Sequence, residues 1–206
     1  MARLGLFPLP IVLLPTERVP LHIFEPRYRE LIGECIESGD EFGIVLLKAS
    51  GDIYHVGTRA AVVEVLQVLE DGRMNILVEG GDRFRLLEVD HDRAFATATV
   101  EELEDESDPP APADVERALA VFGQLQRTVG STLELPDKDA PQLDFELAAR
   151  VDFGVDAKQE LLALTSPRLR MTRLVGLLET ALETLKLERE LQQRAQRNGK
   201  VSPLGD

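Results

Sequence analysis

The chain has 206 residues, of which 44% are apolar and 29% are charged, a composition that is ordinary for a soluble globular protein. Its formal net charge of −14 argues against binding to nucleic acid or to anionic membranes, since both need clustered Lys and Arg. Pro8, Pro10 and Pro15 interrupt the N-terminal apolar stretch, so neither a signal peptide nor a membrane-spanning helix is expected. We therefore expect a cytoplasmic protein.

Short apolar or alternating segments separated by Gly and Asp turns fill the chain up to about residue 103, and they predict a compact sheet or barrel. Asp71-Gly72 is typical of a tight hairpin, because both residues tolerate the positive φ of primed turns. Gly80-Gly81 predicts a second bend. The strands are expected over residues 9–14, 42–48, 57–69, 73–79, 82–90 and 94–103.

One helix is expected to interrupt these strands. Pro26 suits the first helical position, where its missing N–H costs nothing. Gly39 is expected to end the helix in a left-handed C-cap. The spacing of the apolar residues predicts a buried face made of Tyr28, Leu31, Ile32, Cys35 and Ile36. Cys35, the single cysteine, cannot form an internal disulfide and is expected to be a small buried residue.

The composition changes at Glu101, where an acidic run up to Asp108 precedes the proline-rich segment 109–112. Like charges repel one another and the prolines disfavour regular structure, so this segment should be extended and exposed. We interpret it as a solvated connector in preference to a functional acidic patch.

After the connector the apolar period becomes helical. Helices are expected from Ala113-Asp114 to about Val129, over 143–151 and 156–164, and from an N-cap at Ser166-Pro167 to about residue 196. The last helix should protrude, because its apolar stripe fades beyond Leu191. Its predicted buried face consists of Met171, Leu174, Leu178, Ala181 and Leu185.

These patterns predict an α+β protein with two subdomains. The expected boundaries are a β subdomain with one inserted helix over 1–103, an acidic and proline-rich linker over 104–112, a helical subdomain over 113–198 and a flexible tail over 199–206.

No pattern of catalytic residues stands out, since the chain lacks a nucleophile with a base, a metal cluster or a phosphate loop at diagnostic spacing. His22, His55 and His91 lie far apart in the chain with no partners at ligand spacing, so no metal and no cofactor are expected. Glu25 and Arg27 form a charged pair, which is better explained by fixing the strand-to-helix corner than by direct contact with a ligand.

The apolar run Leu6–Pro15, followed by the Glu-Pro-Arg-Tyr helix start within Leu21–Arg29, resembles the substrate-binding N-terminal domain of Lon proteases. Further matches are Phe42-Gly43-Ile44-Val45-Leu46, Val56-Gly57-Thr58, Asp71-Gly72-Arg73 and Gly81-Asp82-Arg83-Phe84-Arg85. The resemblance implies a PUA-like β pseudobarrel followed by a helical bundle that ends in a long C-terminal helix. It also implies recognition of unfolded or degron-bearing polypeptides. Because the chain ends at Asp206 without an ATPase or Ser-Lys peptidase domain, we expect a non-catalytic protein.

The leading hypothesis is a polypeptide-binding module that acts as an adaptor, a holdase or a regulator of proteolysis, with a protease component as a further candidate partner. It is expected to be a monomer or a weak dimer. The alternative is a PUA-like domain that binds a small ligand or a nucleotide and has an undetected activity. Phe24, Phe42 and Phe84 are expected to be packed in the core and not presented. The candidate binding or corner residues are His22, Phe24, Glu25, Arg27, Tyr28 and Arg85.

Overall fold

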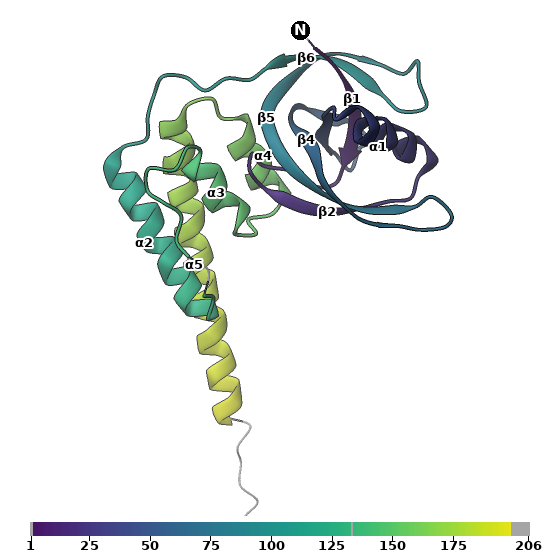
Figure 1. Cartoon of the computed structure of the whole chain (residues 1–206). Helices are drawn as coiled ribbons and strands as arrows, with labels where there is room; N and C mark the ends of the chain where they lie inside the picture. Colours follow the sequence, from purple (N-terminus) through teal and green to yellow (C-terminus); the bar gives the residue numbers. More distant parts are fainter. Residues whose placement is uncertain (1, 133, 199–206) are drawn as a thin grey trace, which may run out of the picture.

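A computed structural model describes residues 2–132 and 134–198 of the chain. A β subdomain and a helical subdomain lie side by side, and the last helix extends away from both (Figure 1). The strands are β1 (Ala2–Leu9), β2 (Arg18–Ile23), β3 (Phe42–Leu47), β4 (Ile53–Val68), β5 (Met74–Asp90) and β6 (Thr97–Glu102). The helices are α1 (Pro26–Ser38), α2 (Pro112–Val129), α3 (Leu143–Ala149), α4 (Val155–Ala163) and α5 (Pro167–Asn198). The α+β prediction is confirmed, and the predicted tail over 199–206 lies outside the described residues.

Five of the strands close into a barrel. β1 pairs in parallel with β3, and antiparallel pairings link β3 to β4, β4 to β5, β5 to β6 and β6 back to β1. β2 stays outside this ring and pairs only with the first part of β5, from Met74 to Glu79. None of the described helices is long and apolar enough to cross a membrane.

Helix α1 forms as the sequence predicts. Pro26 occupies its first turn, and Gly39 ends it with φ 75°, where the left-handed backbone favours glycine. Tyr28, Leu31, Ile32 and Cys35 are buried against the sheet. Burial raises the pKa of the Cys35 thiol to about 11, which keeps the thiol protonated and unreactive.

Ile36 was predicted to be buried, and this is wrong, since the residue is 40% exposed. It lies near the C-terminal end of α1, where the helix faces an edge of the sheet and not its interior. The helical spacing alone does not show where the covering sheet ends.

The predicted strand over 9–14 is also wrong. β1 ends at Leu9, and the following apolar residues form an irregular segment whose side chains are buried, with Leu13 and Leu14 at most 1% exposed. The carbonyl of Leu13 accepts a hydrogen bond from the Thr58 hydroxyl at 2.6 Å instead of a ladder bond. The apolar run therefore reflects burial and not strand pairing. Strand β2, which follows this segment, was not predicted.

The bend expected at Gly80-Gly81 is absent, because β5 continues through both residues. A Cβ on Gly80 would lie 2.1 Å from the carbonyl oxygen of Leu14, so this glycine permits a close backbone approach and not a turn. The hairpin at Asp71-Gly72 does form. Only Gly72 of that pair has a positive φ, and a hydrogen bond between the Leu69 N–H and the Arg73 carbonyl closes a longer loop than a two-residue primed turn.

The helical subdomain is built on the packing of α2, α3 and α4 around the first half of α5. The Ser166 hydroxyl accepts a hydrogen bond from the Leu169 N–H at 3.1 Å and caps α5 as predicted. Of the predicted buried face, Met171, Leu174 and Leu178 are buried, whereas Ala181 and Leu185 are only partly buried. α5 then continues past α2 (Figure 1).

Replacement of Leu178 by Ala should lower the free energy of unfolding by about 2–5 kcal/mol, because it opens a cavity in a fully buried site. Leu187→Ala on the same helix is the matched control, since Leu187 is exposed, and it should change stability by less than about 0.5 kcal/mol. Urea denaturation measures both values. Equal losses for the two variants would show that the assignment of the buried face is wrong.

Candidate functional site

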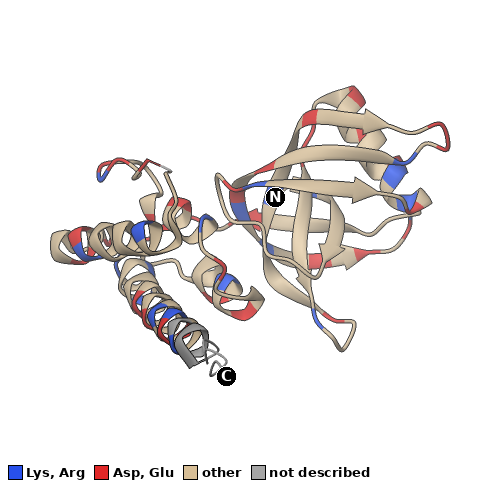
Figure 2. Ribbon diagram, turned by 90° about the horizontal axis from the view of Figure 1, so that it is seen from below, with Lys and Arg blue, Asp and Glu red and all other residues tan. Residues whose placement is uncertain are grey.

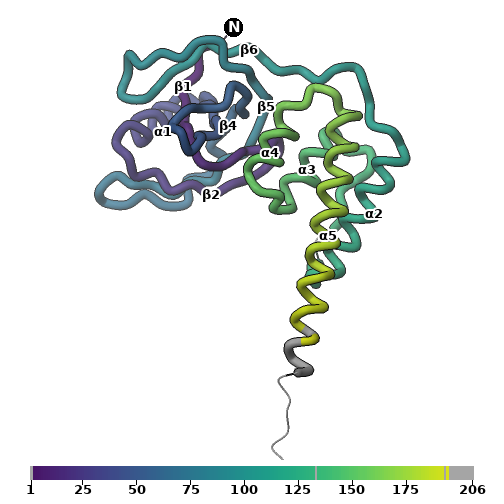
Figure 3. The backbone as a smooth tube through the Cα atoms, turned by 180° about the vertical axis from the view of Figure 1, so that it is seen from behind, coloured from purple at the N-terminus to yellow at the C-terminus, as the bar shows by residue number. Residues whose placement is uncertain are grey.

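Three strand segments project beyond the barrel as a small sheet of their own. They are β2, residues Met74–Glu79 of β5 and residues Ala61–Val68 of β4, and we call this sheet the β-extension. Seen from behind, β2 begins near α4, and the hairpin that joins β4 to β5 points away from the long helix α5 (Figure 3). The two faces of the β-extension have different surroundings.

The inner face of the β-extension belongs to the hydrophobic core. Ile23, Ile76 and Val78 are at most 1% exposed and pack in one cluster with Leu31 and Ile32 of α1. This packing fixes the orientation of the sheet, because a one-residue slip in register would turn these side chains to the solvent.

The outer face of the β-extension has no covering element among the described residues. A polar row crosses its three strands, since His22 Nδ1 and Asn75 Oδ1 lie 2.6 Å apart and the Asn75 amide donates to Gln67 at 3.1 Å. The ring of Phe24 stacks on His22 with centroids 5.9 Å apart. Leu66 lines a shallow depression beside His22, and the side chains of Phe24 and Leu66 are 58% and 49% exposed.

The second half of β4 is an edge strand of the β-extension, with β5 on one side of it and no strand on the other among the described residues. β3 pairs with β4 only as far as Ala60, and two β-bulges follow, between Val62 and Glu64 and between Val65 and Gln67. Four apolar side chains of this segment are more than 40% exposed, namely Val63, Val65, Leu66 and Val68. Isolated exposed apolar residues are common, but a cluster of this kind indicates an interaction surface.

A groove of about 190 Å³ separates this edge from the C-terminal end of α1. Ile36 and Val63 contribute apolar atoms to its lining, and Asp40 and Glu64 contribute carboxylates. Neither carboxylate forms an ion pair with a described residue. The groove therefore has both apolar and polar lining, and its negative charge is not compensated by an ion pair among the described residues. Elsewhere, acidic and basic residues are interspersed over both subdomains (Figure 2).

A larger cavity, of about 660 Å³, lies on the other side of α1. Most of its charged residues neutralise one another, since Arg3 pairs with Asp92 at 3.0 Å and Arg93 pairs with Glu34. The exception is Asp40, which lines both this cavity and the groove. Arg59 lies 3.6 Å from Glu41. Because each charge in these pairs has an opposite partner, the pairs favour neither an anionic nor a cationic ligand.

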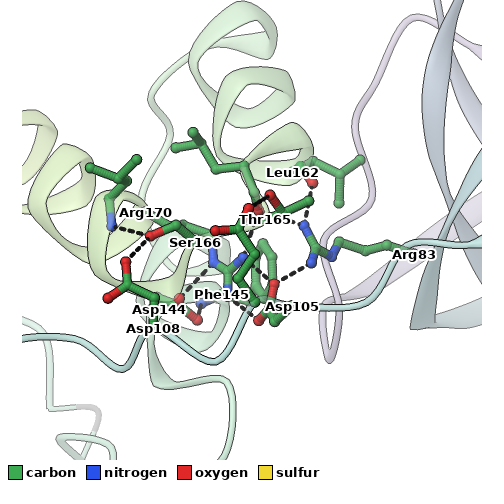
Figure 4. Close-up of polar contacts among 12 residues, drawn as sticks. Arg83, Asp105, Asp108, Asp144, Phe145, Leu162, Thr165, Ser166 and Arg170 are labelled. Carbon is green, nitrogen blue, oxygen red and sulfur yellow. Dashed lines mark hydrogen bonds and ion pairs between the residues drawn. The ribbon is translucent and has the colours of Figure 1, made fainter.

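A buried charge cluster joins the two subdomains (Figure 4). Arg83 of β5 donates to the carbonyls of Leu162 at 2.8 Å and Leu164 at 2.7 Å, and it forms an ion pair with Asp105. Arg170 of α5 donates to the same Asp105 at 2.6 Å. One carboxylate from the connector therefore holds a cation of each subdomain.

Asp144 completes this cluster. Its carboxylate accepts a hydrogen bond from Arg170 at 2.6 Å, and both side chains are nearly inaccessible to solvent. The guanidinium of Arg170 lies 4.1 Å from the ring centroid of Phe145, which adds a cation–π contact. Such a buried network is specific in geometry, because each charge depends on its partners for solvation.

The charges of the cluster support one another. Burial would raise the pKa of Asp105, but the hydrogen bonds and charges of Arg170 and Arg83 outweigh it and hold that pKa below its ordinary value. Burial would lower the pKa of Arg170, and the contacts with Asp105 and Asp144 outweigh it and raise that pKa. Asp108, beside the cluster, remains partly exposed, and its carboxylate accepts hydrogen bonds from Ser166 at 2.6 Å and Arg168 at 2.7 Å.

Most of the acidic segment is exposed, as expected, and within it Asp105 and Asp108 also make the ion pairs and hydrogen bonds described above. The sequence contains one signal of this cluster. Arg170 lies four residues before Leu174 and eight before Leu178, which places a cation on the buried face of α5. An arginine at such a position needs a buried partner.

The structure does not bring the six candidate residues together in one cavity. His22 and Phe24 lie on the outer face of the β-extension, and the expectation that Phe24 is packed is wrong, since it is 58% exposed. Arg27 and Glu25 form an ion pair of 2.8 Å at the start of α1, which fits a corner role. Tyr28 is buried against Phe7, and the Arg27 guanidinium lies 4.5 Å from its ring centroid. Arg85 lies elsewhere, 3.6 Å from Glu101 of β6.

Comparison with known proteins decides the family. The family model of the ATP-dependent protease La (LON) substrate-binding domain matches residues 3–180. The chain belongs to the Lon substrate-binding domain family. The resemblance drawn from the sequence motifs is confirmed.

Two curated relatives show the extent of the likeness. The Lon protease of Solibacter usitatus is 30% identical over 156 residues, which cover 71% of this chain and 19% of that protein. The Lon protease of Anaeromyxobacter dehalogenans is 28% identical over 201 residues, which cover 87% of this chain and 23% of that protein. The chain thus spans a quarter or less of the Lon proteases that it matches.

Solved structures share the fold. A Lon N-terminal domain protein from Xanthomonas campestris superimposes with a TM-score of 0.69 and 26% identity, covering 85% of this chain and 98% of that one. The N-terminal domain of Mycobacterium avium complex Lon protease gives a TM-score of 0.63 at 16% identity and supports the fold alone. The arrangement of a β subdomain followed by helices is therefore that of Lon N-terminal domains.

Replacement of Arg170 by Met should lower the free energy of unfolding by about 3–5 kcal/mol, because it leaves the buried carboxylate of Asp144 without its cation. Arg173→Met is the matched control, since Arg173 pairs with Glu160 at the surface, and it should cost at most about 1 kcal/mol. The measurement is chemical denaturation followed by circular dichroism. A cluster that does not stabilise the fold would give similar midpoints for both variants.

The cluster should also depend on pH. Because the folded pKa of Asp105 lies below its ordinary value of about 3.9, its stabilising contribution is present above that pH and is lost as the pH falls through the folded pKa. The stability difference between the natural protein and Asp105→Asn should therefore be largest near neutral pH and shrink under acid. Denaturation at several pH values measures it, and a difference that grows under acid would contradict this account.

Proposed function

We propose that this protein binds unfolded or degron-bearing segments of other polypeptides through the β-extension, and that it serves as a non-catalytic adaptor, holdase or regulator of proteolysis. The single observation that carries the proposal is the uncovered outer face and edge, on which Phe24, Leu66, Val63 and Val65 are exposed in a member of a substrate-binding family. Unfolded polypeptides expose the apolar side chains that such a surface can cover.

The rigid framework around the surface favours this function. Ile76 and Val78 anchor the β-extension in the core, so the exposed side chains need not be ordered at the moment of binding. The net charge of −14 keeps a protein with exposed apolar groups in solution and disfavours acidic clients. It also disfavours nucleic acid as a partner.

The alternative of a small-ligand or nucleotide site is less well supported. It required His22, Arg27, Tyr28 and Arg85 to converge on one concave pocket, but only Arg27 and Tyr28 contact each other, whereas His22 and Arg85 lie elsewhere on the β subdomain. The cavity of about 660 Å³ has the volume for a ligand, but its arginines are paired with carboxylates.

The test is a fluorescence anisotropy titration of the protein against a reduced and alkylated, permanently unfolded polypeptide and against its folded parent, at low and at high salt. The double variant Phe24→Ser and Leu66→Ser should bind the unfolded form at least about tenfold more weakly, because each side chain loses apolar burial of about 1.5 kcal/mol or more. Binding should survive added salt, since apolar contacts are not screened.

The matched control is the double variant Leu187→Ser and Leu191→Ser, which removes two equally exposed apolar side chains from α5. It should leave the affinity unchanged. If the control weakens binding as much as the outer-face variant, or if the natural protein binds the folded parent equally well, the proposed function is wrong.

A further inference from the structure

The second half of β4 has an unpaired side. β5 pairs with one side of this segment throughout, from Val62 opposite Val78 to Val68 opposite Met74. On the other side β3 reaches only Ala60, and no described strand continues beside Ala61–Val68. Since backbone groups of a strand point alternately to its two sides, a row of N–H and C=O groups on the outer side is available for another chain.

The place beside this edge lies in line with β3. Helix α1 ends at Gly39, and the chain joins the sheet only at Phe42, opposite Ala60. An added strand would occupy the position that β3 would fill if it began earlier. It would lie along the groove of about 190 Å³ between α1 and β4, where one row of its side chains meets Ile36 and Val63.

From this geometry we infer that the edge Ala61–Val68 binds an extended client segment by strand addition, a proposal that rests on the function proposed above and specifies its binding mode. Main-chain hydrogen bonds supply affinity for many sequences, and alternate side chains supply selectivity. The groove selects a segment with apolar residues at alternate positions. The uncompensated carboxylates of Asp40 and Glu64 select a basic residue beside them.

The charge of the edge argues for a foreign segment and against a second copy of this chain. Two copies joined edge to edge would bring the same carboxylates, Asp40 and Glu64, of both molecules toward one shared interface. The two bulges also bend this strand, and a folded partner edge would have to match that bend. An unfolded segment can follow it, because its backbone is free to adapt.

The experiment compares two short fluorescent peptides in which valine alternates with threonine between terminal lysines. The first has an ordinary backbone, and the second is N-methylated at every valine and threonine, which preserves the side chains and removes the backbone donors. If strand addition holds, methylation should weaken binding at least about tenfold, since roughly two or three hydrogen bonds of about 1 kcal/mol are lost. Equal affinity of the two peptides would overturn the proposal.

A charge reversal on the protein tests the position. Glu64→Lys should weaken binding of the peptide with terminal lysines and strengthen binding of one with terminal glutamates. Glu88→Lys makes the same change of net charge on an exposed residue of β5 outside the β-extension, and it should affect neither peptide beyond a uniform electrostatic shift. Equal effects of both substitutions would contradict an edge site.

The remaining outcomes separate the two proposals. If the unfolded polypeptide binds but the alternating peptide does not, strand addition is overturned and the proposed function stands. If neither binds, both proposals are overturned.

Discussion

The strand that pairs with one side of β5 changes part-way along β5, and this change determines the layout of the molecule. From Met74 to Arg85 this strand pairs with β4, but its other neighbour is β2 up to Glu79 and β6 from Phe84 onward. The barrel closes only through the second part, so the first part must project as a three-stranded extension. Gly80 permits the change, because any side chain there would collide with the carbonyl of Leu14. A closed barrel has no free edge, whereas the projecting sheet retains one.

The charge cluster between the subdomains has a complementary role. Asp105 joins Arg83 of the barrel to Arg170 of α5, and the carbonyls of Leu162 and Leu164 take up the remaining donors of Arg83. A buried ion network of this kind is weak evidence for high stability, but it admits few geometries. It fixes the helices against one side of the barrel, and the hairpin end of the β-extension points away from them (Figure 3).

The sequence predicted the parts of the fold that rest on local chemistry. Pro26 and Gly39 delimited α1, Ser166 capped α5, and the helical period placed Leu174 and Leu178 in the core. The family followed from motifs that extend over most of the chain.

The sequence could not show which apolar residues are buried in irregular segments and which are exposed. The apolar run before Pro15 reads as a strand although Leu13 and Leu14 are buried in an irregular segment. Phe24 reads as a core residue because its chemistry is apolar, and only the packing of neighbouring strands shows that it is exposed. The free edge of β4 depends on where β3 begins relative to β4, a register that the sequence does not state. The role of Asp105 depends on residues far away in the chain.

The measurement that tests the account most directly is amide hydrogen exchange of the full chain with and without the unfolded polypeptide. Strand addition predicts new protection at alternate amides of Ala61–Val68, because backbone donors that face solvent in the free protein gain partners. The β4 amides that already donate hydrogen bonds to β5 should show little change in their exchange rates. Protection confined to α2 and α5, or no new protection in β4 while the polypeptide is bound, would contradict the account.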